Sequence, residues 1–161
     1  RSVSRGLGDV YKRQQTDKSI KKLVDNNLLI IKENEVKRPN VNSEEFIECQ
    51  ALGRIAQRSI DRFYILMLQL WRNEESHISI NELEKKCRKI SKNLEARHSW
   101  LMPEFSEKWT FDLFINHLIE AKFVKKDEKG FVYPLNITKR IEDDFKTFIT
   151  PEWQEELFNL E

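Results

Sequence analysis

A mainly α-helical fold with short β-hairpins is predicted by three observations. The chain of 161 residues holds only four Gly and four Pro, fewer than a sandwich or barrel with many tight turns needs. Charged residues make up 34% of it, and apolar residues recur at steps of three and four, the spacing of one helix face. Apolar residues make up 39%, including ten Phe and four Trp, so a chain of this length can bury a sizeable core.

The first fourteen residues are expected to lie outside the fold. The segment Asp9 to Gln14, DVYKRQ, reads as the translation of a transposon end used to attach sequencing adapters. We therefore interpret residues 1–14 as a disordered artefact and, since the chain also lacks an initiator Met, expect an incomplete protein. Without the four basic residues and one acidic residue of this segment, 24 basic and 26 acidic residues remain, a net charge of −2. Bulk charge then gives no support to nucleic-acid binding.

Residues 15–40 are predicted to be the tail of an upstream helix–hairpin unit. Asp17 to Asn26 has the spacing of a helix end, and Leu28 to Ile31 reads as a strand that turns back towards Val36. Pro39 and Asn40 are turn-forming residues and end this unit.

Residues 41–161 are predicted to form a helical C-terminal domain. Its first helix is capped by Asn42 or Ser43, bends near Gly53 and reaches Arg72. Within it the stripe Phe63, Met67 and Trp71 is predicted to face a core rather than a cofactor pocket. The residues that recur at steps of three and four along this helix are Phe46, Cys49, Leu52, Ala56, Ile60, Phe63, Met67 and Leu70.

Two further helices carry clear start signals. Ser79 to Glu82 is a capping box, and the apolar face that follows is Leu83, Cys87, Ile90 and Leu94. The next helix is predicted after Pro103, with Ser106 as its cap, and its apolar positions are Phe111, Phe114, Ile115, Leu118 and Ile119.

A hairpin near residues 123–133 is predicted to follow, because Gly130 supplies the positive φ that its turn needs. Thr138 to Phe148 and a short segment starting at Pro151 are predicted to be the last helices. The order of three helices, a hairpin and a further helix predicts a winged-helix-like arrangement.

The two cysteines, Cys49 and Cys87, are too few and too far apart for a disulfide framework or a zinc site. We expect buried free thiols in a reducing compartment, and neither a metal nor a cofactor. No run of apolar residues approaches the ~20 needed to cross a bilayer, and no signal peptide is visible.

The stretch from Ile80 to Val124 resembles the C-terminal region of the bacterial membrane-associated glycerol-3-phosphate acyltransferase family. The matching features are a helix start at Ile80-Asn81 with Leu83-Glu84-Lys85, a later His98, the loop Pro103-Glu104-Phe105, and a helix containing Phe111 and Phe114. Arg62-Phe63-Tyr64 precedes them at the family's distance, and weaker similarity covers nearly all of residues 15–133. The Pro103-Glu104-Phe105 motif is interpreted as structural.

This resemblance implies a parent enzyme that transfers an acyl group from acyl-CoA or acyl-carrier protein to glycerol 3-phosphate at the cytoplasmic face of the bacterial inner membrane. In that family an HxxxxD motif supplies the general base. Five residues beyond His77, His98 and His117 stand Glu82, Pro103 and Lys122. We therefore assign no catalytic residue, and expect a non-catalytic fragment that is inactive alone.

A basic helix face is the most suggestive candidate site: Lys85, Arg88, Lys89 and Lys92. It is a candidate for binding an anionic membrane surface or acyl-carrier protein, with the rest of the parent enzyme as a further partner. The alternative is an ordinary solvated face, flanked by Glu82, Glu84 and Glu95.

A winged-helix module that binds DNA or another protein is the competing hypothesis, with Glu107 to Lys122 as its recognition helix. Two lysines of this segment are offset by Glu107, Asp112 and Glu120. Since phosphate contacts supply most nonspecific affinity for DNA, a recognition helix should be basic, and no nucleic-acid partner is expected.

Overall fold

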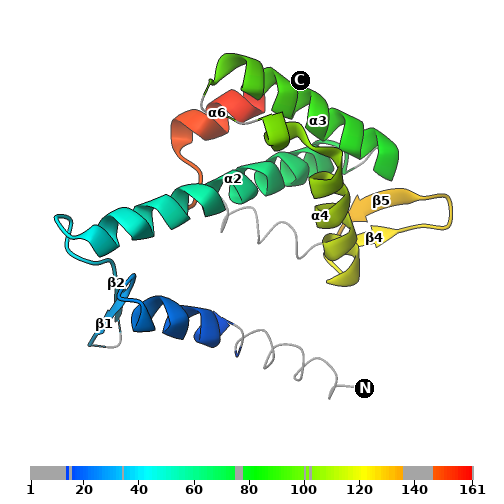
Figure 1. The fold of residues 1–161 in the computed structure, drawn as a ribbon. Coiled ribbons are helices and arrows are strands. Elements are labelled where there is room, and N and C mark those ends of the chain that lie inside the picture. Colours follow the sequence, from blue (N-terminus) through cyan, green and yellow to red (C-terminus); the bar gives the residue numbers. More distant parts are fainter. Residues whose placement is uncertain are drawn as a thin grey trace, which may run out of the picture. The chain divides into compact units, whose positions relative to one another are not determined.

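The computed structural model describes residues 14, 16–33, 35–74, 78–99, 101, 103–135 and 147–160, and these are mainly helical, as predicted (Figure 1). The chain divides into two compact units, Arg1–Ala56 and Gln57–Glu161. Helix α2, Glu44–Arg72, runs through the division. The domain limits 15–40 and 41–161, and the artefact interpretation of residues 1–14, stay predictions.

The first unit begins with a helix over residues 16–25. Asn27, with φ of 58°, ends it in the left-handed region that Asn tolerates. The backbone N–H of Leu28 donates to the carbonyl of Leu23 at 2.8 Å, so the reversal also satisfies a carbonyl of the last turn. This confirms the predicted helix end.

A two-stranded hairpin follows, as predicted. Strands β1 (Ile30–Lys32) and β2 (Glu35–Lys37) pair antiparallel with Ile31 opposite Val36. Ser43 then caps α2, because its hydroxyl accepts a hydrogen bond from the N–H of Phe46 at 3.2 Å.

The first half of α2 corrects one prediction. Cys49 was expected to be a buried thiol but is only half-buried, and near it Leu52 is 46% exposed and Ala56 is exposed. The stripe Phe63, Met67 and Trp71, further along the helix, does pack in the core, as predicted. An apolar stripe is buried only where another element packs against it. Among the described residues of the first unit, the short helix and the hairpin accompany this half of α2, and Leu52 and Ala56 stay exposed beside them.

Replacement of Gly53 by alanine is expected to raise the free energy of unfolding by about 0.5–1 kcal/mol. Gly53 lies in the continuous helix α2, and an added Cβ would meet no atom within 4 Å. Gly130→Ala is the matched control and should instead destabilise by about 1 kcal/mol, because Gly130 has φ of 84°. Urea unfolding followed by circular dichroism measures both. A loss of stability in Gly53→Ala would contradict the helix assignment there.

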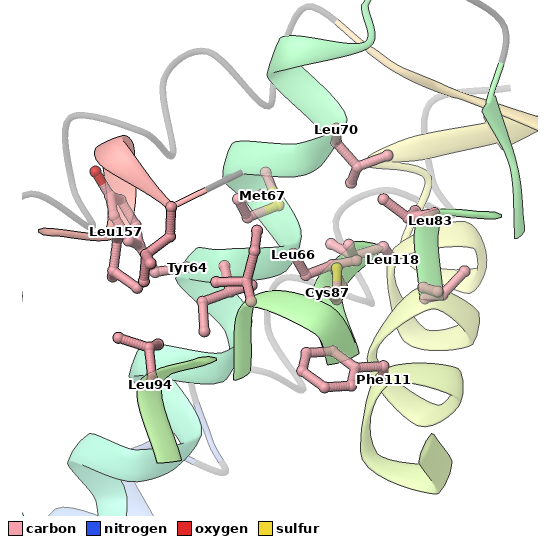
Figure 2. Close-up of a cluster of buried hydrophobic side chains, with 14 of the residues drawn as sticks. Tyr64, Leu66, Met67, Leu70, Leu83, Cys87, Leu94, Phe111, Leu118 and Leu157 are labelled. Carbon is pink, nitrogen blue, oxygen red and sulfur yellow. The ribbon is translucent and has the colours of Figure 1, made fainter. Parts of the chain in front are cut away.

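The second unit holds the hydrophobic core. Helix α3 (Ile80–Arg97), helix α4 (Lys108–Glu120) and helix α6 (Pro151–Asn159) contribute to it together with the second half of α2. Figure 2 shows side chains from all four helices pointing towards one another. The core confirms the predicted faces of α3 and α4, and its most buried members include Leu66, Met67, Leu83, Cys87, Leu94 and Phe111.

A three-stranded sheet completes this unit. Strands β4 (Val124–Lys126) and β5 (Phe131–Pro134) form the predicted hairpin, with Gly130 at positive φ. A short strand, β3 (Ile78–Ser79), pairs with the other edge of β5, giving the order β3-β5-β4. Ser79 also caps α3, where its hydroxyl accepts from the N–H of Glu82 at 3.2 Å.

Two predictions have different outcomes at the C-terminal end. Pro151 begins helix α6, as predicted, with Thr150 as its cap. Most of the predicted helix from Thr138 to Phe148 lies outside the described residues, and its last two residues, Thr147 and Phe148, lie in a turn. The winged-helix-like arrangement stays a prediction.

Candidate functional site

The Pro103-Glu104-Phe105 motif forms a short 3-10 helix, η1 (Pro103–Ser106), whose aromatic side chain enters the core. Phe105 is only 3% exposed. The guanidinium of Arg62 on α2 lies 5.8 Å from its ring centre and donates to the carbonyl of Glu104 at 3.1 Å. Cation–π and hydrogen-bond contacts from one side chain thus tie η1 to α2.

Helix α3 holds the other end of η1. The carboxylate of Glu95 accepts the backbone N–H of Ser106 at 2.8 Å and its hydroxyl at 3.0 Å. Arg88 donates to the carbonyl of Ser106 at 3.2 Å. The prediction that Ser106 caps the following helix was wrong, because the N-cap of α4 is Glu107, which makes no side-chain cap bond. The hydroxyl of Ser106 instead donates to Glu95.

The candidate basic face is divided by these contacts. Lys85, Lys89 and Lys92 are exposed, whereas Arg88 is half-buried and also pairs with the buried carboxylate of Glu84 at 3.3 Å. The structure therefore brings three of the four predicted cations to the surface of α3 and uses Arg88 to support η1.

The histidines have separate surroundings. His98 ends α3, and its Nε2 lies 2.8 and 2.9 Å from the two carboxylate oxygens of Glu156 on α6. The ring of Trp153 packs against it edge-on at 5.2 Å. His117 is exposed in the last turn of α4, and His77 lies outside the described residues.

Asp61 is a buried carboxyl group that sequence reasoning missed. It is 2% exposed and accepts a hydrogen bond from the side-chain amide of Gln57 at 2.9 Å. A cavity of about 400 Å³ beside it is lined by these two residues with Phe148, Thr150 and Trp153. Burial raises the pKa of Asp61, and hydrogen bonds from Gln57 and Trp153 offset part of that rise. The sequence did contain a signal for this burial: Asp61 stands four positions before Ile65, on the face of α2 that is buried.

Asp61→Asn is expected to change how stability depends on pH. The folded chain favours protonated Asp61, so the stability it contributes is present below the unfolded pKa and is lost as pH rises through the higher folded pKa. Asn does not ionise. The stability of the parent chain relative to Asp61→Asn should therefore fall between about pH 4 and pH 7. Urea unfolding at both pH values measures this, and a difference that stays constant or grows with pH would contradict it.

The buried Cys87 does not lie in a reactive setting. Both cysteines are free; Cys87 is fully buried, and burial, with a smaller effect of Glu84, raises the pKa of its thiol. Among the described residues, no group of three His, Cys, Asp or Glu side chains could hold a metal ion. Within the same residues, no helix has the length and apolarity that a membrane span requires.

Known proteins place the chain in one family. The sequence model described as "Glycerol-3-phosphate acyltransferase C-terminal region" matches residues 11–127. The glycerol-3-phosphate acyltransferase of Pseudomonas fluorescens (strain SBW25) is 30% identical over 114 residues, which cover 71% of this chain and 14% of the relative. That of Alteromonas mediterranea is 26% identical over 145 residues, 90% of this chain and 18% of the relative.

The chain thus spans less than a fifth of the length of these two relatives. No solved structure matches it. The family match contains η1, its supports Arg62, Arg88 and Glu95, and the start of the β4–β5 hairpin. The chain belongs to the family of glycerol-3-phosphate acyltransferase C-terminal regions.

Proposed function

We propose that this chain is the non-catalytic C-terminal region of a glycerol-3-phosphate 1-O-acyltransferase and serves as its packing and docking module. The parent enzyme would transfer an acyl group from acyl-CoA or acyl-carrier protein to glycerol 3-phosphate in phospholipid synthesis. The observation that carries this proposal is the use of the family-matching motif. Phe105 fills the core, and the backbone on either side of it is bonded to α2 and α3.

The positions of the histidines support the proposal that this region is non-catalytic. In an HxxxxD motif the carboxylate that orients the general base stands five residues after the histidine. The residue at that distance from His98 is Pro103, and the carboxylate beside His98 comes from Glu156 on α6. For His117 the corresponding residue is Lys122.

Exposed lysines on α3 support the proposed docking role of the chain. Lys85, Lys89 and Lys92 face solvent, and near a membrane with anionic lipids each would contribute about 1 kcal/mol of attraction. We place this face against the anionic cytoplasmic surface of the inner membrane, with acyl-carrier protein as the other acidic partner to be tested. An ordinary solvated face would show neither interaction.

The DNA-binding alternative is not favoured. The matching family is an acyltransferase region, and Lys108 on α4 is paired with Asp112 at 2.6 Å, which offsets its charge. Phosphate contacts would need such cations to be available.

The docking proposal is tested by reversing the three exposed charges with Lys85→Glu, Lys89→Glu and Lys92→Glu in one variant. Sedimentation with phosphatidylglycerol vesicles should show binding weakened by about 100-fold at low salt. Activity with acyl-carrier protein is measured in parallel after the same change in the parent enzyme. The matched control reverses Lys125, Lys126 and Lys129, which are exposed on the hairpin, and should change binding much less. Unchanged vesicle binding and unchanged carrier-dependent activity in the α3 variant would refute the docking part.

A further inference from the structure

A second cavity of the described chain lies between the end of α2 and the middle of α3. It measures about 400 Å³ and is lined by Gln69, Arg72, Asn73, Lys86, Lys89 and Ile90. This volume falls in the range of small-molecule sites, ~300–1,000 Å³. Of its lining residues only Lys89 belongs to the basic face, so the cavity is a separate feature.

Of the described residues that line the cavity, three are cations and none is a carboxylate. Among the residues that the structure describes, Arg72, Lys86 and Lys89 form no ion pair. Cations gathered around one concave surface raise the local concentration of anions, because low-dielectric walls focus their field. The charge of this cavity therefore favours an anionic ligand.

Two of the cations are held in place by neutral groups. Nζ of Lys86 donates to the side-chain oxygen of Asn73 at 2.8 Å, and Nδ2 of Asn73 donates to the carbonyl of Gln69 at 2.6 Å. An ammonium has three N–H donors, so this arrangement orients Lys86 and leaves donors for a ligand.

Arg72 is fixed in a similar way. It donates to the carbonyls of Leu160 and Phe158, and its guanidinium lies 5.0 Å from the centre of the Phe158 ring. Neither carbonyl neutralises its charge. The cavity thus holds oriented donors whose positive charge is not offset, which is the arrangement that recognises a phosphate group.

We propose that this cavity, which we call the Lys86 pocket, binds a phosphate group. Lys86 and Arg72 would hold the phosphate oxygens, Lys89 would add charge at the rim, and the buried Ile90 would form an apolar wall for the carbon portion of the ligand. The phosphate belongs either to a soluble molecule or to a lipid headgroup.

The test titrates the full chain with inorganic phosphate by calorimetry, against chloride at equal ionic strength. We expect a dissociation constant of about 1 mM or tighter. Lys86→Met should weaken binding about tenfold, because it removes a charged donor but keeps the stem of the side chain. Lys89→Met, at an exposed position, should weaken it about threefold.

Lys125→Met is the matched control, since it removes one exposed lysine far from the lining residues in sequence, on β4. Its affinity should stay within about twofold of the parent chain. Thermal unfolding of each variant checks that the fold is kept, and Lys89→Met keeps the test informative if Lys86→Met unfolds. Absence of phosphate binding beyond chloride, or equal weakening in Lys125→Met, would overturn the proposal.

Vesicles distinguish the two sources of the phosphate. If the ligand is a headgroup, the chain should bind vesicles of phosphatidic acid and phosphatidylcholine in a manner that Lys86→Met weakens and inorganic phosphate displaces. If it is soluble, Lys86→Met should leave vesicle binding unchanged while it weakens phosphate binding. Because Lys86 is not part of the basic face, failure of the phosphate titration leaves the docking proposal intact.

Discussion

Phe105→Ala is expected to lower the free energy of unfolding of the chain by about 3–5 kcal/mol, the usual cost of emptying a buried aromatic site. The side chain is 3% exposed, and its loss would also remove the cation–π contact with Arg62. Urea unfolding followed by circular dichroism measures the change.

Phe148→Ala is the matched control because the same side chain is there 59% exposed. It should cost less than about 1 kcal/mol. Equal losses in the two variants would show that η1 does not depend on burial of Phe105, and would remove the main structural interpretation of the family motif.

Glu95→Ala should cost about 2–3 kcal/mol, because it leaves the N–H of Ser106 without its acceptor and its hydroxyl with only the longer bond to the carbonyl of Pro103, at 3.4 Å. Ser106 is only 8% exposed, so water replaces these bonds poorly. Ser106→Ala removes the hydroxyl bond but keeps the backbone bond, and should cost about 1 kcal/mol. The same unfolding experiment compares them.

The order of these two losses matters more than their sizes. A larger loss in Ser106→Ala than in Glu95→Ala would mean that the hydroxyl stabilises α4 directly, as the sequence had suggested. The structure instead assigns the main stabilisation to the acceptor on α3.

Local signals predicted much of the second unit. The apolar spacing of Leu83, Cys87 and Leu94 fixes which side of α3 is buried, and the cap at Ser79 needs only four neighbouring residues. The turn at Gly130 likewise depends on a local property, the positive φ of that glycine. Such features are decided within one or two turns of the chain, so a single sequence contains the information they need.

The failures concern contacts between residues distant in sequence. Ser106 is a good helix cap by type, but Glu95 takes its hydroxyl from another helix. The burial of Asp61 depends on the residues around α6, almost 90 positions away. Leu52 continues the apolar spacing of α2, yet it is 46% exposed, because spacing along one helix does not show what packs against it. The two residues of β3 are also too few to show the alternation of a strand.

The candidate sites show the same difference between local features and contacts that are distant in sequence. Spacing along α3 predicted where Lys85, Lys89 and Lys92 gather. It could not predict that Arg88 turns to Ser106, nor that Lys86 and Arg72 line one cavity, because these depend on how α2, α3 and η1 meet.

The rate of acyl transfer to glycerol 3-phosphate tests the central proposal most directly. It should be measured for this chain alone and for the Pseudomonas fluorescens relative carrying this chain's 114 matching residues in place of its own. We expect no transfer above background for the chain alone and retained transfer for the chimaera. Acyl transfer by the chain alone, or a folded chimaera without activity, would contradict it.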